Sequence, residues 1–300
     1  MPWTFERVSG AKQGACGGLA WDGKAILFSA VDESRVLRFD PSTGETSEFR
    51  RYTYRVNGLG FGPGGELYAC QEGGRRVIQF MPDGSATFTE VRLAGKMHNY
   101  PTDLMVDRKG RIWFADPHHK IPTIGPQMYP LLDHESVLRL ERDNRRDWKM
   151  KRVTFDTFCP RAVMLSPDET VLYVAVGDGV VTEQCSLRAY PIREDGSVGL
   201  YETLFAFGAD HRGMHRGAEG LCLDDEGNLV ACAGSTKSGP GALIYVISPS
   251  GAVLETHELP FDMPIRCAFG GAGLESLYVT SGDGGLYRAN AGNRHGYQRF

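Results

Sequence analysis

One pattern recurs six times along this chain of 300 residues, and it restricts the fold to a repeat architecture. An apolar run with alternating polar residues passes through a turn that contains glycine or acidic residues. It then returns as a second run that ends in an aromatic or small residue. The six copies begin at Gly17, Asn57, Thr102, Arg161, Glu219 and Ile265. These starts lie about 40 to 59 residues apart, the spacing at which four-stranded blades are laid around a central axis.

The remainder of each repeat predicts the outer strands of a blade. A third run follows in every repeat, for example RVLRFDP at 35–41, and most repeats hold a fourth, for example AVLETHEL at 252–259. We therefore predict an all-β fold, a six-bladed β-propeller with four-stranded blades around a central channel, formed by residues 1–300 as a single domain. The run TFERV at 4–8 is expected to close the ring by pairing with the last repeat.

The composition argues against several classes of partner. The formal net charge is −4 and acidic and basic residues are interspersed, which predicts neither a nucleic-acid interface nor a polybasic membrane anchor. The first residues lack the apolar core of a signal peptide, so we expect a cytoplasmic protein. The seven cysteines show no C-x-x-C spacing and are expected to be free thiols, in keeping with a reducing compartment.

Residues at the starts of the first strands are the predicted functional site. In a propeller these strands line the channel, so their starts converge on one mouth. The second position of each start holds, in order, Gly18, Gly58, Asp103, Ala162, Gly220 and Arg266. The six start residues form a first column around the channel, and the six residues that follow them form a second column. Together the two columns are expected to point four ionisable side chains at one small volume, namely Asp103, Arg161, Glu219 and Arg266.

Polar residues in neighbouring loops extend this predicted site. His215 lies four residues before Glu219 and is a candidate catalytic acid or base, because histidine titrates near neutral pH; the alternative is a structurally hydrogen-bonded side chain. The insertion at 117–136 is expected either to cover the channel as a flap or to pack on its face. The candidate substrate contacts are Asn57, His98, Asn99, Thr102, His118, His119 and Arg266.

Several of these segments resemble the gluconolactonase, senescence-marker-protein and luciferin-regenerating-enzyme family. The similar stretches are NGLGFGPGGELYACQEGGRRV from Asn57, NYPTDLMVDRKGRIWFADP from Asn99, EGLCLDDEGNLV from Glu219 and CAFGG from Cys267. The resemblance implies a six-bladed propeller with a divalent cation, often calcium, at the channel mouth. There the cation polarises the carbonyl of a lactone or ester. The ligands that the resemblance implies are a Glu in blade 1, an Asn in a P-N-D motif, an Asn in a P-N-G motif and an Asp in a D-G motif.

This sequence departs from the family at all four ligand positions. Gly17 stands where the Glu is expected, P-N-D has become P-T-D at 101–103, P-N-G has become P-R-A at 160–162, and the Asp has become Glu219. Calcium takes six or more oxygen ligands, and Arg161 brings a positive charge into the mouth. We therefore predict no metal and no cofactor. A divalent cation such as calcium at Glu219 and Asp103 is the alternative.

The resemblance implies a hydrolase that acts on a small lactone or ester, and the substituted ligand positions lead us to predict that it needs no metal. Arg161 would stabilise the oxyanion in place of the cation, and Asp103 or Glu219 would activate water or pass a proton. In the opposing interpretation Arg161 pairs with Glu219 and Arg266 with Asp103, which neutralises the channel of a non-catalytic ligand-binding or scaffold propeller. A third possibility is a lyase or isomerase that uses the same channel. In the enzyme interpretations the partner is a small-molecule substrate.

Overall fold

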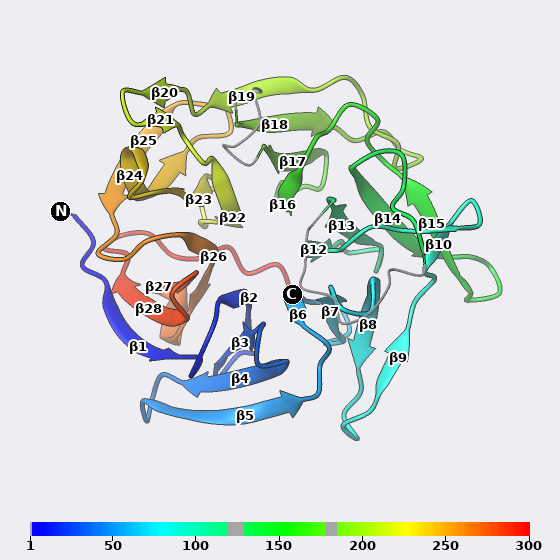
Figure 1. The fold of residues 1–300 in the computed structure, drawn as a ribbon, viewed down its shortest axis with the longest axis horizontal. Coiled ribbons are helices and arrows are strands. Elements are labelled where there is room, and N and C mark those ends of the chain that lie inside the picture. Colours follow the sequence, from blue (N-terminus) through cyan, green and yellow to red (C-terminus); the bar gives the residue numbers. More distant parts are fainter. Residues whose placement is uncertain (1, 119–128, 178–184) are drawn as a thin grey trace.

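The computed structural model describes residues 2–118, 129–177 and 185–300. In this part of the chain six four-stranded antiparallel sheets stand around a central axis, as Figure 1 shows. This arrangement confirms the predicted all-β, six-bladed propeller. The same residues contain no α-helix and one short 3-10 turn, η1 (Ala272–Leu274). No helix among them could therefore span a membrane.

Blades 1 to 3 follow one another along the chain as simple meanders, each with its first strand innermost. Blade 1 consists of β2 (Cys16–Trp21), β3 (Ile26–Ala30), β4 (Arg35–Asp40) and β5 (Glu45–Arg51). Blade 2 consists of β6 (Val56–Phe61), β7 (Leu67–Gln71), β8 (Arg76–Phe80) and β9 (Ala86–Phe88). The strands of blade 3 are β12 (Asp103–Val106), β13 (Ile112–Asp116), β14 (Ser136–Arg142) and β15 (Trp148–Arg152).

Blades 4 and 5 repeat this order, and two short hairpins lie outside the blades. Blade 4 consists of β16 (Pro160–Leu165), β17 (Val171–Val176), β18 (Ser186–Pro191) and β19 (Glu202–Ala206). Blade 5 consists of β22 (Ala218–Leu223), β23 (Leu229–Ser235), β24 (Ser238–Ile247) and β25 (Val253–Glu258). The hairpins pair β10 (Arg92–Leu93) with β11 (Lys96–Met97), and β20 (Ala209–Asp210) with β21 (Gly213–Met214).

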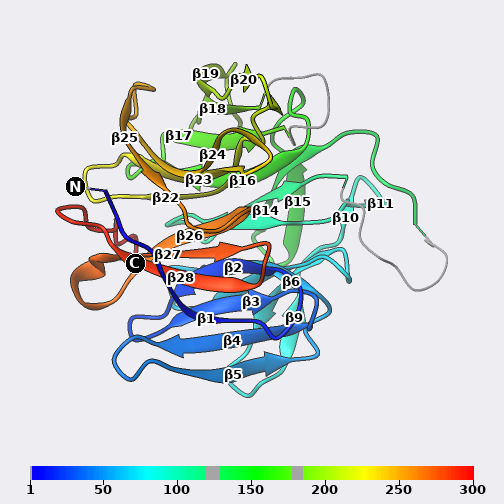
Figure 2. The same ribbon diagram turned by 60° about the vertical axis from the view of Figure 1, so that its left-hand side comes forward.

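Blade 6 joins the two ends of the chain and closes the ring. Its inner strands are β26 (Pro264–Gly270), β27 (Ser276–Ser281) and β28 (Gly285–Asn290), and its outer strand is β1 (Glu6–Gly10). Figure 2 shows β1 alongside β28. The predicted closure by the N-terminal run is therefore confirmed, although the strand begins at Glu6. The preceding aromatic residues Trp3 and Phe5 are buried in the core that blades 5 and 6 share.

The hydrophobic core lies between neighbouring blades. One cluster, for example, joins Tyr68 and Cys70 of blade 2 to Leu104 and Phe114 of blade 3. Each sheet thus buries its faces against the next, so stability depends on the complete ring. None of the seven cysteines, all of which lie in the described ranges, forms a disulfide.

Glycines in the second column allow the first strands to approach one another around the channel. A Cβ atom on Gly220 would lie 2.6 Å from the Cα atom of Arg266, and one on Gly58 would lie 2.8 Å from the Cα atom of Asp103. Both distances are too short for any side chain. The first strands can therefore form the closed inner ring in which each contacts its neighbours.

Candidate functional site

Residues of the first column lie in β-bulges at the starts of the first strands. Strand pairing skips Arg161, Glu219 and Ile265, because in each case only the residues on either side face partners in the second strand. The first strands of blades 1 and 2 have the same irregularity, and Thr102 directly precedes β12. A bulge leaves one residue out of the ladder and redirects its side chain. These side chains therefore meet at one end of the channel, here called the entrance mouth.

Arg161 and Glu219 contact each other in the entrance mouth, as the repeat register predicted. The Nη1 atom of Arg161 lies 3.7 Å from Oε2 of Glu219. A second guanidinium, that of Arg216, approaches the other carboxylate oxygen to 2.9 Å. The arginine side chains are 17% and 19% exposed and the glutamate side chain 6%. A molecule that enters the mouth would thus meet the guanidinium groups with the carboxylate beneath them.

A second carboxylate, that of Glu72, lies beside Asn57 in blade 2. The Asn57 side chain donates a hydrogen bond of 2.6 Å to Glu72, which is buried and lies 3.6 Å from Nη2 of Arg55. A Cβ atom at Gly17 would lie 2.5 Å from Oδ1 of Asn57. Because Gly17 has no side chain, the Asn57 amide can occupy this position without a clash. Glu72 and Arg216 are residues of this mouth that the repeat pattern did not select.

Arg266 and Asp103 form a separate pair deeper in the channel. Arg266 Nε lies 3.2 Å from Asp103 Oδ1, and the Val163 amide donates to the other oxygen. The Arg266 guanidinium also donates to four main-chain carbonyls, those of Thr102, Arg161, Glu219 and Ile265. Burial raises the pKa of Asp103, and Arg266 opposes this shift. The single cluster of four ionisable groups expected from the sequence is thus divided into two ion pairs at two depths.

A cavity of about 1420 Å³ lies on the other side of this inner pair, where the first strands end. We call it the exit cavity; Asp103 and Arg266 contribute to its lining, but Arg161 and Glu219 do not. Volume alone would place the functional site here. The entrance mouth is nevertheless the candidate site considered below, because two partly exposed guanidinium groups meet a carboxylate there.

Three predicted substrate contacts instead fix the base of the 117–136 insertion. His98 and Asn99 are fully buried: His98 Nδ1 lies 2.8 Å from Asp116, and Asn99 accepts a hydrogen bond from the Leu132 amide. His118 Nε2 lies 2.9 Å from the Leu132 carbonyl oxygen. Arg75, which the sequence patterns did not indicate, donates to the main-chain carbonyls of His98 and Asn99, which precede β12, and of Tyr129 and Pro130, which lie within the insertion. His119 lies outside the described residues.

His215 is a fully buried residue with both ring nitrogens engaged. The Gly217 amide donates to its Nδ1, so the proton must be on Nε2, which lies 3.2 Å from the Tyr245 hydroxyl. The ring stacks on Phe207. Burial lowers the pKa of His215 to about 4. These contacts favour the structural alternative, and we leave His215 out of the proposed catalytic groups.

The charges around Glu219 disfavour a divalent cation at that residue. Gly17 has no ligand atom, the two oxygens of Glu219 face Arg161 and Arg216, and the Asp103 carboxylate faces Arg266. A cation near Glu219 would be repelled by both guanidinium groups. A calcium site shared by Glu219 and Asp103 is disfavoured for the same reason, since the two carboxylates belong to separate ion pairs.

Comparisons with known proteins agree with this architecture. The chain is 27% identical over 284 residues to a gluconolactonase of Zymomonas mobilis, covering 88% of this chain and 75% of that protein. It is 28% identical over 266 residues to a 6-deoxy-6-sulfogluconolactonase of Pseudomonas putida, covering 86% and 79%. Its fold matches the solved structure of a gluconolactonase from Xanthomonas campestris with a TM-score of 0.80, at 26% identity and coverage of 96% and 89%.

The profile of the SMP-30/Gluconolactonase/LRE-like region matches residues 16–283, from the first strand of blade 1 to just past β27 of blade 6. The match includes both columns of the channel, although all four expected ligand positions carry other residues. This chain therefore belongs to the SMP-30/gluconolactonase/LRE-like family.

Proposed function

We propose that this chain hydrolyses a small lactone or ester at the entrance mouth without a metal ion. The relatives named as gluconolactonase and sulfogluconolactonase support a lactone as the substrate class. The observation that carries the proposal is the 3.7 Å contact of the Arg161 guanidinium with the Glu219 carboxylate, at bulged positions that face one another. A fixed positive charge next to a carboxylate supplies the two groups that ester hydrolysis needs.

The proposed reaction proceeds by attack of a water molecule on the lactone carbonyl. Glu219 accepts the proton of the water as its oxygen bonds to the carbonyl carbon, and the Arg161 guanidinium stabilises the negative charge that develops on the carbonyl oxygen. When the ring C–O bond breaks, the proton on Glu219 passes to the leaving alkoxide, and the product is the open hydroxy acid. Arg216, 2.9 Å from Glu219, orients the carboxylate throughout.

A non-catalytic ligand-binding propeller is the second candidate. Two facts favour it: Arg161 pairs with Glu219, and Arg266 with Asp103, so the charges along the channel are balanced by protein groups. The proposed hydrolase differs in one measurable respect, because it must turn over a substrate at the mouth.

A substrate screen distinguishes the two candidates. Purified protein is assayed with gluconolactone, a sulfonated sugar lactone and nitrophenyl acetate, each with and without a chelator, and its metal content is determined after dialysis. We expect at least one lactone to be hydrolysed at the same rate in the presence of the chelator. Binding of a lactone without turnover would favour the ligand-binding propeller, and loss of turnover with the chelator would contradict the metal-free mechanism.

A further inference from the structure

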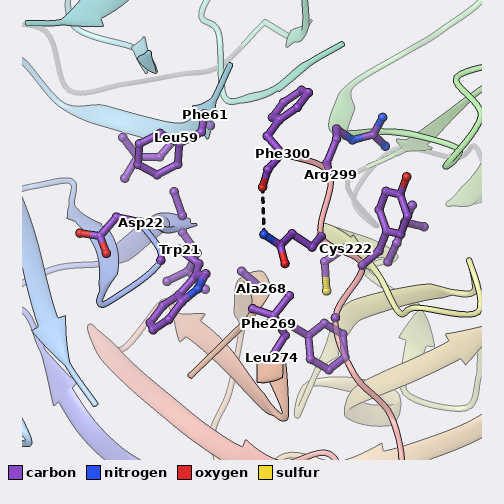
Figure 3. Close-up of a pocket in the computed structure, with 18 of the residues that line it drawn as sticks. Trp21, Asp22, Leu59, Phe61, Cys222, Ala268, Phe269, Leu274, Arg299 and Phe300 are labelled. Carbon is purple, nitrogen blue, oxygen red and sulfur yellow. Dashed lines mark hydrogen bonds between the residues drawn. The ribbon is translucent and has the colours of Figure 1, made fainter. Parts of the chain in front are cut away.

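We infer that the exit cavity is a binding site for an uncharged aromatic small molecule, separate from the entrance mouth. The cavity, of about 1420 Å³, exceeds the range of roughly 300 to 1,000 Å³ typical of small-molecule sites, so a ligand of ordinary size fits. Figure 3 shows its lining, with Trp21, Phe61, Phe269 and Phe300 around the space. This inference goes beyond the proposed hydrolysis and does not depend on it.

The walls are apolar because of the strand pattern itself. Each first strand places apolar side chains on the channel beyond its mouth residue, for example Leu19 and Trp21 in blade 1 and Leu59 and Phe61 in blade 2. All six blades contribute to the cavity in this way. Aromatic side chains bring large contact areas and prefer stacked or edge-to-face partners, so they favour an aromatic ligand.

Sulfur atoms form a polarisable part of the same wall. Met105, Met164, Cys222 and Cys267 line the cavity, and the sulfur atoms of the two cysteines lie 3.7 Å apart. Thioether and thiol groups make favourable contacts with aromatic rings. These side chains strengthen the preference for an aromatic over a purely aliphatic ligand.

Three charged side chains of the cavity wall, those of Arg266, Arg299 and Asp22, are engaged with other protein groups, whereas Lys24 and Asp225 lie at exposed positions of the lining. Arg266 contacts Asp103, and Arg299 lies 2.9 Å from Glu169 and donates to the Leu165 carbonyl. Asp22 accepts hydrogen bonds from the main-chain amides of Lys24 and Ala25. A charged ligand would have to compete with these contacts, whereas an uncharged ligand leaves them intact.

The segment at 294–300 forms one side of the cavity and is firmly held. It runs to the centre of the ring in Figure 1, and its main chain bonds to Leu274 and Leu223 through the amides of Gly296 and Tyr297. Arg299 then ties it to blade 4, and the Gln298 side chain donates to the Phe300 carbonyl, as drawn in Figure 3. Phe300 is thus positioned before any ligand arrives, which lowers the entropy lost on binding.

The probe for the test is N-phenyl-1-naphthylamine, an uncharged aromatic amine that fluoresces in apolar surroundings. We expect saturable binding of one molecule per chain, with quenching of tryptophan fluorescence by the probe beside Trp21. Two variants add bulk to the cavity: Ala268→Phe on its wall, and Gln298→Trp at an exposed lining position of the 294–300 segment. Each should weaken binding about tenfold or more, which corresponds to roughly 1.4 kcal/mol.

The matched control is Leu200→Trp, which adds the same indole to a side chain that is 89% exposed and lies outside the cavity lining. This variant and Arg161→Ala should bind the probe like the wild type. Non-saturable binding, or wild-type affinity in Gln298→Trp with an unchanged melting temperature, would overturn the inference. Equal weakening in Leu200→Trp would also overturn it. Gln298→Trp should retain lactone turnover, so failure of this site and failure of the proposed hydrolysis give different results.

Discussion

At the scale of single residues, the chemistry of this propeller depends on which side chain occupies each bulge. Four positions where the family resemblance implies cation ligands here hold Gly17, Thr102, Arg161 and Glu219. The backbone positions are retained, because the bulges that aim them are present. The substitutions therefore bring a permanent positive charge, that of Arg161, to one of these positions.

The inner pair makes a prediction about stability. Arg266→Met removes the partner of the buried Asp103 carboxylate and the donor to four main-chain carbonyls. We expect a loss of about 3 to 5 kcal/mol in the free energy of unfolding, measured by denaturant titration. The double variant Arg266→Met/Asp103→Asn should recover part of this loss. As a control, Arg288→Met breaks an exposed pair with Glu6 and should change stability by about 1 kcal/mol or less. An Arg266→Met protein as stable as this control would contradict the structural role of the pair.

His215 makes a prediction about pH. Its pKa in the folded protein is about 4, below the 6.5 of an unperturbed histidine, so the unfolded chain binds more protons between these pH values. The contribution of His215 to the free energy of unfolding is therefore fully present above pH 6.5. It decreases as the pH falls towards 4, by up to about 3 kcal/mol. His215→Gln should flatten the pH dependence of the free energy of unfolding between pH 4 and 6.5.

The control is His211→Asn, because the His211 side chain is 87% exposed. This variant should retain the pH dependence of the wild type. His257, whose pKa burial also lowers, is common to all three proteins. If the free energy of unfolding depends on pH in the same way in the wild type and in His215→Gln, the lowered pKa of His215 is contradicted.

At the scale of elements, the ring is closed by a short strand and the aromatic residues before it. Trp3 donates its main-chain amide to His257 and stacks on that ring at a centroid distance of 4.0 Å, and Phe5 packs edge-on against Phe261. These contacts attach β1 to blades 5 and 6 in addition to its pairing with β28. Removing one of them should loosen the point where the two ends of the chain meet.

Phe5→Ala tests this closure. Phe5 is buried, so truncation should lower the free energy of unfolding by about 3 to 5 kcal/mol. The matched control is Phe88→Ala in β9, where the side chain is 57% exposed and truncation should have little effect. Thermal denaturation of both variants is the measurement. Equal melting temperatures would mean that the N-terminal residues do not support the ring.

Much of the fold could be predicted from sequence, because each blade repeats the same alternation and the same turn chemistry. The repeat register also placed Arg161 and Glu219 together correctly. The opposing interpretation named the Arg266–Asp103 pair as well. The repeat register did not place this pair at a different depth from Arg161 and Glu219, because it does not tell where side chains at neighbouring positions of a strand point. Glu72, Arg75 and Arg216 were missed because they lie outside the inner strands, where no periodicity marks them.

At the scale of the whole molecule, the channel has two dissimilar halves. The entrance mouth gathers charged groups around Glu219, the exit cavity is mainly apolar, and the Arg266–Asp103 pair lies between them. This division follows from the first strands: Asn57, Arg161 and Glu219 lie at irregularities near the strand starts, and the residues that follow along the strands are mainly apolar. It allows one ring to offer a site for hydrolysis at one end and a site for an uncharged ligand at the other.

The most direct test of the proposed chemistry is the rate of lactone hydrolysis by Arg161→Ala in chelator-treated protein. We predict a fall on the order of 10² to 10³, the usual effect of losing one oxyanion donor. The melting temperature should stay close to that of the wild type, because Arg216 still contacts Glu219. The control Arg212→Ala, in the hairpin of β20 and β21, should retain full activity. Full activity in Arg161→Ala, or wild-type activity that the chelator abolishes and calcium restores, would contradict Arg161 as the replacement for the cation.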